Sequence, residues 1–406
     1  MKKINLLFLF VVLFSINNFA QVAGKDSSIS KNLGNEKKWF EKISIRGYMQ
    51  VRYNRLLETN ENLNCEQCDK SIGNNGGFFM RRMRVIIYGQ VHPQVYFYVQ
   101  PDFASSASST GLHFGQLRDA YVDVGVDPHN EFRFRIGQSK IPYGFENMQS
   151  SQNRLPLDRS DALNSSHSNE RDLGVFFYYT PKKFRKLYSN LVNEGYKGSG
   201  DYGVFAFGAY NGQLANKSEQ NNTPHIVSRL SYPFELKNQV LELGIQAYYG
   251  KYILTSDQLS TGVKYKSDKS YSDERIAATL NLAPKPFGIL AEYNVGQGPE
   301  YNSVTDSIET RSLSGGFITL SYMHKHKGMT IMPFTRFQLY EGGKKQELDA
   351  RSYSVKEVEM GIEWQFNKNF ELVTAYTISD RRFEDFKKQS NLQKGNFLRL
   401  QAQVNF

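Results

Sequence analysis

Arginines recur at even spacings in several short segments of this 406-residue chain. They are Arg46 and Arg52, Arg82 and Arg84, and Arg133 and Arg135. In a β-strand, residues an even number of positions apart share a face, so each pair would lie on one side of its strand. The guanidinium group offers a planar fork of donors that matches phosphate and carboxylate groups. The pattern therefore predicts a basic surface that attracts anions.

Acidic residues occupy the same polar faces of the predicted strands. They are Asp102, Asp119, Asp123, Glu242, Glu292, Glu359 and Glu363. Two interpretations remain open: the arginines attract anions from water, or they pair with these acids and brace the structure. Because the acids would oppose the arginines, we expect a weak to moderate anion preference rather than strict phosphate specificity.

Other residue types suggest neither a metal site nor a catalytic site. Cys65 and Cys68 are the only cysteines, and a structural zinc site would need further soft ligands. A local disulfide is the favoured interpretation, with a pair of free thiols as the alternative. The seven histidines fall mostly in predicted turns and loops, and no serine-centred nucleophile motif is present. We therefore expect no cofactor, no metal and no enzymatic activity.

The end of the chain identifies the elements that carry these residues. Leu398, Leu400, Ala402, Val404 and Phe406 alternate with Phe397, Arg399, Gln401, Gln403 and Asn405. This is a strand with one apolar and one polar face, and it closes on an aromatic residue. Such an ending resembles the insertion signal of bacterial outer-membrane barrels.

Similar alternation recurs along the chain and predicts about sixteen strands. They lie near residues 43–54, 77–90, 94–103, 119–124, 132–137, 171–180, 202–211, 224–234, 239–250, 272–283, 287–297, 311–323, 329–340, 352–366, 370–380 and 394–406. Short connections alternate with long ones, as in an outer-membrane barrel. Residues 181–201 should form a short turn but are too long, which indicates a missed hairpin or an insertion. Residues 297–310 are expected to form one of the long loops.

The beginning of the chain predicts export. Lys2 and Lys3 precede a short apolar run and a small residue, Ala20, so residues 1–20 read as a signal peptide. Residues 21–42 would be a flexible periplasmic lead-in, and residues 43–406 the barrel. The formal net charge of +10 would suggest nucleic acid for a soluble basic protein, but an exported chain does not ordinarily meet nucleic acid.

The predicted fold is all-β: a transmembrane, antiparallel, up-and-down barrel. A closed barrel leaves no unpaired edge, as a bilayer requires. With about sixteen strands it is too wide for side chains to fill, so it would enclose an aqueous channel. A secreted β-rich binding protein or adhesin, and a barrel enzyme of the outer membrane, are the alternative functions.

Four motifs resemble the phosphate-selective porin O and P family. They are F-M-R-R-M-R-V-I-I-Y-G at 79–89, L-R-D-A-Y-V-D at 117–123, R-I-G-Q-S-K-I-P-Y-G-F-E at 135–146 and E-R-D-L-G-V at 170–175. The resemblance implies a sixteen-stranded, trimeric outer-membrane porin in which wall arginines and constriction lysines guide anions. The matching positions are Arg81, Arg82 and Lys140. Strict alternation directs Arg81 outward, at the rim.

In porins the third long loop commonly folds inward, and here that loop is residues 140–170. Loops of this length are usually functional. Lys140, Arg154 and Arg159 would then lie at the constriction, beside Asp158, Asp161 and Glu170. A solvated external loop is the alternative. The chain is thus predicted to be an outer-membrane channel for small hydrophilic solutes that prefers anions, with phosphate and polyphosphate as candidate solutes. Its expected partners are membrane lipid, two further copies of itself and the barrel-assembly machinery.

Overall fold

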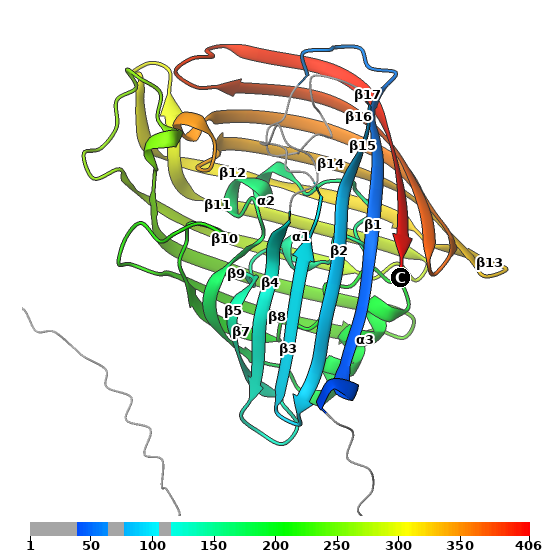
Figure 1. The fold of residues 1–406 in the computed structure, drawn as a ribbon. Coiled ribbons are helices and arrows are strands. Elements are labelled where there is room, and N and C mark those ends of the chain that lie inside the picture. The colour runs from blue at the N-terminus through cyan, green and yellow to red at the C-terminus, as the bar shows by residue number, and fades with distance from the viewer. Residues whose placement is uncertain (1–38, 64–76, 105–114) are drawn as a thin grey trace, which may run out of the picture. The chain divides into compact units, whose positions relative to one another are not determined.

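The computed structural model describes residues 39–63, 77–104 and 115–406. Their strands form one antiparallel sheet in which each strand pairs with its neighbours in the chain. The sheet closes on itself because β1 (Ile43–Leu56) pairs with both β2 (Gly77–His92) and the last strand, β17 (Asn391–Asn405). Figure 1 shows blue β1 lying beside red β17 at this seam. The predicted up-and-down barrel is confirmed.

The remaining strands follow in chain order. They are β3 (Val95–Asp102), β4 (Gln116–Gly125), β5 (Phe132–Lys140), β6 (Arg171–Tyr179), β7 (Phe205–Tyr210), β8 (His225–Glu235), β9 (Val240–Ile253), β10 (Ser270–Leu282), β11 (Phe287–Asn302), β12 (Ser307–Tyr322), β13 (His324–His326), β14 (Met329–Gly343), β15 (Ser352–Asn367) and β16 (Phe370–Glu384). The short β13 continues β12 past Met323, and both pair with β14. The seventeen strands in the described chain therefore form a sixteen-stranded barrel.

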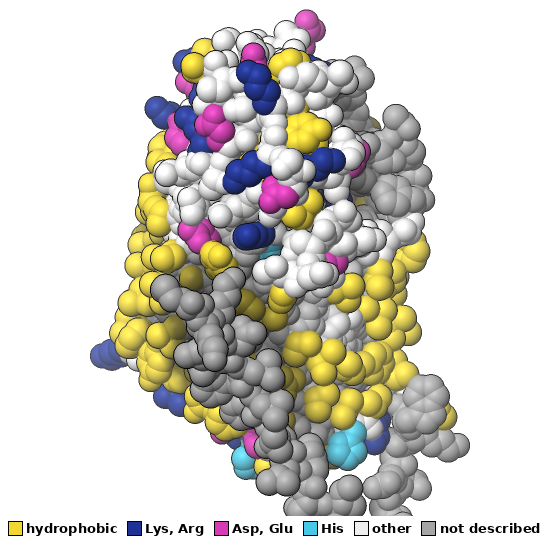
Figure 2. All heavy atoms as spheres, turned by 90° about the vertical axis from the view of Figure 1, so that its left-hand side faces the viewer, with side chains coloured by type: hydrophobic (Ala, Val, Ile, Leu, Met, Phe, Trp, Pro, Cys, Tyr) yellow, Lys and Arg dark blue, Asp and Glu magenta, His cyan; other side chains and the backbone are white. Residues whose placement is uncertain are grey.

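The period-two pattern separates the two faces of this sheet. In β17, Arg399, Gln401 and Gln403 are buried toward the interior, whereas Leu400 and Val404 are exposed outside. Exposed apolar residues recur on the other strands, including Ile45, Val175, Phe207, Leu230, Ile245, Ile276, Val295, Ile318 and Phe337. Figure 2 shows apolar side chains covering much of the lower part of one face, with charged side chains gathered toward the upper end. An apolar outer surface of this kind suits contact with lipid.

The connections largely follow the predicted alternation of short and long. The strand pair β11–β12 departs from it, because Asn302 pairs with Ser307 and only residues 303–306 connect them. The expectation of a long loop at 297–310 is therefore wrong: both strands continue into that segment and their ladder holds it. Within the described chain, no helix is long and apolar enough to cross a membrane.

The long connection between β6 and β7 is an insertion rather than a missed hairpin. It contains α3 (Lys182–Asn193), whose buried residues Phe184, Tyr188 and Leu191 recur at helical spacing. They pack against Val204 and, at neighbouring strand ends, against Val240 and Ala283. This apolar contact explains why a helix forms where a tight turn was expected.

Several predictions concern residues outside the described ranges. The proposed signal peptide, most of the lead-in, Cys65 and Cys68 lie there. The end of the lead-in forms a short 3-10 helix, η1 (Trp39–Lys42), before β1 begins. Two other 3-10 turns, η3 (Ser256–Gln258) and η4 (Leu348–Ala350), lie in the long loops.

Candidate functional site: the inward loop and the cavity beside it

Residues 141–170, called the inward loop here, fold into the barrel and carry two short helices, α1 (Phe145–Met148) and α2 (Asp161–Ser166). Nearly the whole loop is buried, and it contacts inward-facing residues on strands far apart in the sequence. The Tyr143 hydroxyl donates to Asn294 Oδ1 at 2.5 Å, and Arg275 Nη1 donates to the Ala162 carbonyl at 2.9 Å. The predicted inward position is confirmed, and the solvated external alternative is wrong.

Asp158 fastens the middle of the inward loop to the wall. Its carboxylate lies 3.2 Å from Arg52 Nη1 on β1 and 2.6 Å from Arg399 Nη1 on β17. Burial opposes ionisation of Asp158, but Arg52 and Arg399 outweigh it and hold its pKa well below the ordinary range. Arg336 Nη1 on β14 donates to the Asp158 carbonyl at 2.7 Å. The loop is therefore held by charge-assisted bonds to three strands.

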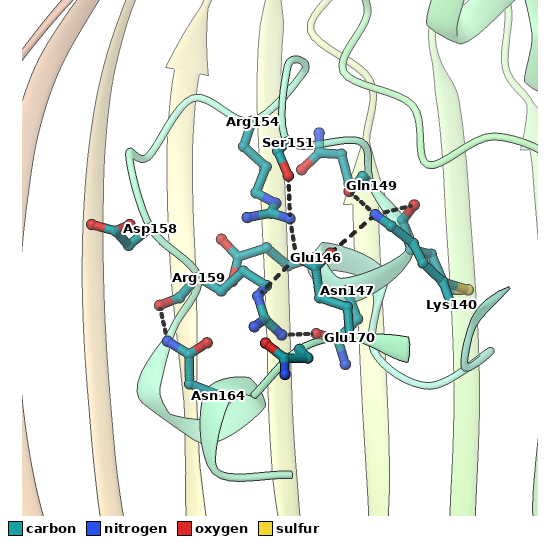
Figure 3. A network of polar contacts seen from close by, with 12 residues as sticks. Lys140, Glu146, Asn147, Gln149, Ser151, Arg154, Asp158, Arg159, Asn164 and Glu170 are labelled. Carbon is teal, nitrogen blue, oxygen red and sulfur yellow. Dashed lines mark hydrogen bonds and ion pairs between the residues drawn. The ribbon is translucent and has the colours of Figure 1, made fainter. Parts of the chain in front are cut away.

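Glu170 ends the inward loop and is shared by four cationic side chains, of which Figure 3 labels Lys140, Arg154 and Arg159. Arg159 Nε lies 3.0 Å away and Lys140 Nζ lies 3.5 Å away, while Arg154 and Arg171 also pair with the carboxylate. Burial raises the pKa of Glu170, but these cations more than reverse the effect and lower it well below its usual value. Arg171 also pairs with Asp119 at 3.0 Å, so two carboxylates serve these four cations and an excess of positive charge remains.

Lys140 and Arg159 also bind backbone carbonyls of the inward loop. Lys140 Nζ donates to the Gln149 carbonyl at 2.7 Å, and Arg159 Nη1 donates to the His167 carbonyl at 2.9 Å. Burial lowers the pKa of Arg159 to about 10, against the opposing charge of Glu170. Arg154 and Arg159 are thus buried in the loop's own network, and neither lines the open cavity.

Arg81 turns inward, contrary to the prediction from strict alternation. The register between β1 and β2 shifts here: Gln50 pairs with Arg82 and Val51 with Met80, so Arg81 is the extra residue of a β-bulge. Its Nη2 lies 3.8 Å from Asp158 Oδ1. Arg82 is buried beside it and donates to Gln50 Oε1 at 2.6 Å. Within the described chain, no carboxylate lies within ion-pair distance of Arg82.

A cavity of about 420 Å³ remains between the inward loop and one side of the wall. It is bounded by the inner faces of β1 to β6, by α3, by the loop near residues 148–153 and by residues 199–202. The predicted residues that line it are Arg46, Arg84, Arg133, Arg135 and Lys140. Arg52 instead lies against the inward loop, where it donates to the Leu157 carbonyl at 2.9 Å.

Most arginines that line the cavity are paired with acids. Arg135 makes two bonds to Asp123, at 2.7 and 2.8 Å, and Arg133 Nη2 lies 3.0 Å from Asp201. Arg84 Nε lies 2.8 Å from Asp102, which Arg118 shares at 3.3 Å. Arg46 is exposed, lies 5.5 Å above the Tyr88 ring and has no carboxylate partner in the described ranges. Both interpretations of the sequence therefore apply: Arg84, Arg133 and Arg135 pair with acids, whereas Arg46 is left to attract anions.

The cavity also contains residues that the sequence analysis did not single out. Tyr96, Tyr98, Tyr121 and Tyr202 line it, together with Gln100. The available signal was the alternation of Tyr96, Tyr98 and Gln100 on one face of a strand. Tyr202 gave no such signal, because it lies in the connection that the sequence pattern left unexplained.

That connection also closes part of the barrel's short-turn end. Lys197 Nζ lies 2.6 Å from Glu363 on β15. The Lys197 backbone carbonyl accepts a 2.8 Å hydrogen bond from the side chain of Gln149 in the inward loop. Farther along, Asp201 reaches Arg133 on β5. The segment 194–201 therefore runs beneath the inward loop from one side of the barrel to another.

No group of three or more His, Cys, Asp or Glu side chains is arranged to hold a metal ion among the residues with described positions. The site's chemistry in this part of the chain consists of charged groups, amides and aromatic rings.

The fold is similar to those of several solved outer-membrane channels. The outer membrane channel DcaP of Acinetobacter baumannii is 13% identical, with a TM-score of 0.55 over 90% of this chain and 97% of that chain. The anion-selective porin from Comamonas acidovorans is 9% identical, with a TM-score of 0.52 over 90% of this chain and 99% of its own. Salmonella typhi OmpF is 13% identical, with a TM-score of 0.55 over 90% and 97%. At these identities the likeness shows the fold.

A search of curated protein sequences finds no match. The family profile described as phosphate-selective porin O and P matches residues 60–406. This match spans most of the chain and includes β2 to β17, the inward loop and all of the cavity's lining residues except Arg46 of β1. The chain therefore belongs to the phosphate-selective porin O and P family and forms a bacterial outer-membrane channel rather than an enzyme.

Proposed function

We propose that the channel passes small hydrophilic solutes by passive diffusion and favours anions. In this proposal solutes travel through the cavity between the inward loop and β2 to β6. Phosphate and polyphosphate are candidate solutes within this anionic class. The loop's contacts with β1, β10, β11, β14 and β17 occupy space on the opposite side of the interior, which favours the cavity as the route.

The observation that carries this proposal is the sharing of carboxylates beside the cavity. Glu170 and Asp119 together serve four cations and Asp102 serves two, while Arg82 and Arg46 have no carboxylate partner in the described chain. Positive charge thus exceeds negative charge around the narrow part of the route. In a space with low-dielectric walls such an excess raises the local concentration of anions.

The same contacts limit the strength of the preference. Arg84, Arg133 and Arg135 line the cavity, but each is paired with an aspartate. A paired guanidinium still presents donors to a solute, although its charge is largely balanced. We therefore infer a weak to moderate preference for anions rather than strict phosphate selectivity.

The assembly and export of the protein are part of the proposal. Residues 1–20 would direct export, residues 21–42 would lie in the periplasm, and residues 43–406 would span the lipid of the outer membrane after insertion by the barrel-assembly machinery. We propose a homotrimer; one structurally similar porin, OmpT of Vibrio cholerae, is known in a trimer form. Cys65 and Cys68 would form a local disulfide.

Reversal potentials of the purified channel test the selectivity. Measured across a planar bilayer in gradients of potassium chloride and then potassium phosphate, they should show greater permeability to the anion than to potassium at low salt. The preference should weaken as salt approaches about 1 M, where the Debye length is only about 3 Å. A channel that favours potassium at low salt would overturn the proposal.

A further inference from the structure

The cavity wall contains a group of tyrosines whose chemistry goes beyond attraction of small inorganic ions. Tyr98 and Tyr121 stack with ring centroids 5.2 Å apart and an interplanar angle of 14°. The Arg135 guanidinium carbon lies 3.9 Å from the centroid of the Tyr121 ring. This stack joins β3, β4 and β5 and holds the rings in fixed positions, because tyrosine has few rotatable bonds.

Three hydroxyls of this group are available to a solute. Tyr96, Tyr121 and Tyr202 line the cavity, and their hydroxyls form no hydrogen bond with any residue whose position is described. The rings are partly exposed rather than buried in the wall. A hydroxyl can both donate and accept, so these groups can bind another hydroxyl in either direction.

Gln100 provides an independent indication of a ligand. Its side chain is 4% exposed, and its Oε1 accepts a 2.8 Å bond from the Tyr98 hydroxyl. Its Nε2 is buried and has no hydrogen-bond partner. A buried donor without a partner is costly unless another molecule supplies an acceptor. Gln100 lines the cavity, so this unpartnered donor lies beside the space that a solute would occupy.

Further amides and cations complete the site. Gln152 and Asn153 of the inward loop line the same cavity as Gln100, and Arg46 adds a guanidinium with no carboxylate partner in the described ranges. A small inorganic anion would use the cations alone. A neutral sugar would use the amides, hydroxyls and ring edges but not the positive charge. A solute that uses all of these groups has several hydroxyls on a ring and one acidic group.

We propose that the cavity binds acidic sugars, that is, single or paired sugar rings that bear a carboxylate or a phosphate. The volume of about 420 Å³ falls in the range of small-molecule pockets. The acidic group would lie near Arg46, Arg133 or Arg135, and the ring hydroxyls would bind the tyrosine hydroxyls and the amides. This inference rests on the proposed anion preference and adds the class of solute.

Current block in single channels tests the inference with the full chain. Glucuronate, glucose 6-phosphate, inorganic phosphate and glucose are each titrated at constant ionic strength. The two acidic sugars should block at concentrations about fivefold or more below that of phosphate, since one extra net hydrogen bond corresponds to roughly that factor. Block by glucuronate alone would assign the site to sugars with a carboxylate, and block by glucose 6-phosphate alone would assign it to sugars with a phosphate. Equal block by phosphate, or by glucose, would overturn the inference.

Substitutions in the wall locate the effect. Gln100→Leu and Tyr202→Leu should weaken block by acidic sugars about fivefold more than block by phosphate. Tyr293→Leu, on the exposed outer face of β11, is the matched control and should leave both blocks unchanged. An equal loss of both blocks in the cavity variants would contradict sugar recognition. If a variant fails to form a heat-resistant barrel, the comparison of solutes on the unmodified channel still decides.

Different results would contradict the anion preference and the recognition of acidic sugars. A channel that favours potassium in a chloride gradient contradicts the proposed anion preference. A channel that favours anions but is blocked equally by phosphate and acidic sugars contradicts only the inference about sugars.

Discussion

The carboxylate of Asp158 lies 3.2 Å from the guanidinium of Arg52, and this contact fastens the middle of the inward loop to the first strand of the barrel. Both side chains are almost fully buried. Removing one partner of such a pair leaves the other charge uncompensated, which costs more than the net stability of the intact pair. The position of the inward loop, and so the width of the channel, depends on this contact and the others to Asp158.

The substitution Asp158→Asn should release the middle of the inward loop. It removes the charge that Arg52 and Arg399 share, and we expect a loss of about 3–5 kcal/mol from the loop's attachment. Trypsin should then cleave after Arg154 or Arg159 in the assembled channel, as mass spectrometry would show. Asp268→Asn, in an exposed loop, is the control. Resistance to trypsin equal to that of the unmodified channel would show that Asp158 does not hold the loop.

Deletion of residues 148–166 should raise single-channel conductance. The segment includes α2 and most of the loop's contacts with β14 to β17, so its removal opens that side of the interior. Conductance is measured in planar bilayers after a check that the variant resists heat in detergent. An unchanged conductance in a folded barrel would mean that the loop does not limit the current.

The inward loop should keep its position down to unusually low pH. The pKa values of Asp158 and Glu170 lie well below their usual values, so their pairs contribute stability above the ordinary carboxyl range of about 4. That contribution is lost only as the pH falls through the lowered pKa values. Single-channel current should therefore be steady from pH 7 to about 4 and become noisy below it. Current noise that begins above pH 5 would contradict the lowered pKa values of Asp158 and Glu170. The Glu170→Gln channel, which lacks one of these charges, should already be noisy at pH 7.

Closure of the barrel should depend on Gly47 and Phe406. Gly47 N donates to the Phe406 carbonyl at 2.7 Å, and a Cβ at Gly47 would lie 2.6 Å from the Phe406 ring and 2.5 Å from the Arg84 carbonyl. Deletion of Phe406 should sharply reduce membrane incorporation. Gly47→Ala should lower stability by about 1–3 kcal/mol through overpacking. Gly115→Ala is the control, since its nearest new contact would be at 3.6 Å. Heat resistance in detergent is measured for each variant. Normal membrane insertion of the chain that lacks Phe406 would contradict the role of this residue in closing the barrel.

The sequence pattern was sufficient to predict the strands, because polar and apolar residues alternate across a wall that separates lipid from water. It failed where one residue interrupts that alternation. Arg81 is such a residue: the bulge against Gln50 and Val51 turns it inward, and nothing in the local sequence marks the extra position. The helix α3 was missed because it replaces a turn and depends on contacts with Val204, Val240 and Ala283.

The chemistry of the site was predicted only in part. The basic residues were recognised by type, but their partners come from distant segments. Asp158 meets Arg52 and Arg399, and Asp201 meets Arg133, only after the loops fold across the barrel. Which arginines are neutralised is therefore a property of the tertiary structure, as is the meeting of Tyr202 with the tyrosines of β3 and β4.

We attribute the channel's preference for anions to excess positive charge beside the inward loop. The decisive measurement is the reversal potential, in a low-salt potassium chloride gradient, of the variant in which Arg82, Arg84, Arg133 and Arg135 are all replaced by Gln. Three of the four are paired with aspartates, so their removal exposes Asp102, Asp123 and Asp201 as well as removing positive charge. A variant in which Lys251, Lys264, Lys266 and Lys387 of the outer loops and rim become Gln is the matched control for net charge. We predict that the arginine variant shifts strongly toward potassium and the control shifts little; an unchanged reversal potential in a folded arginine variant would contradict the account.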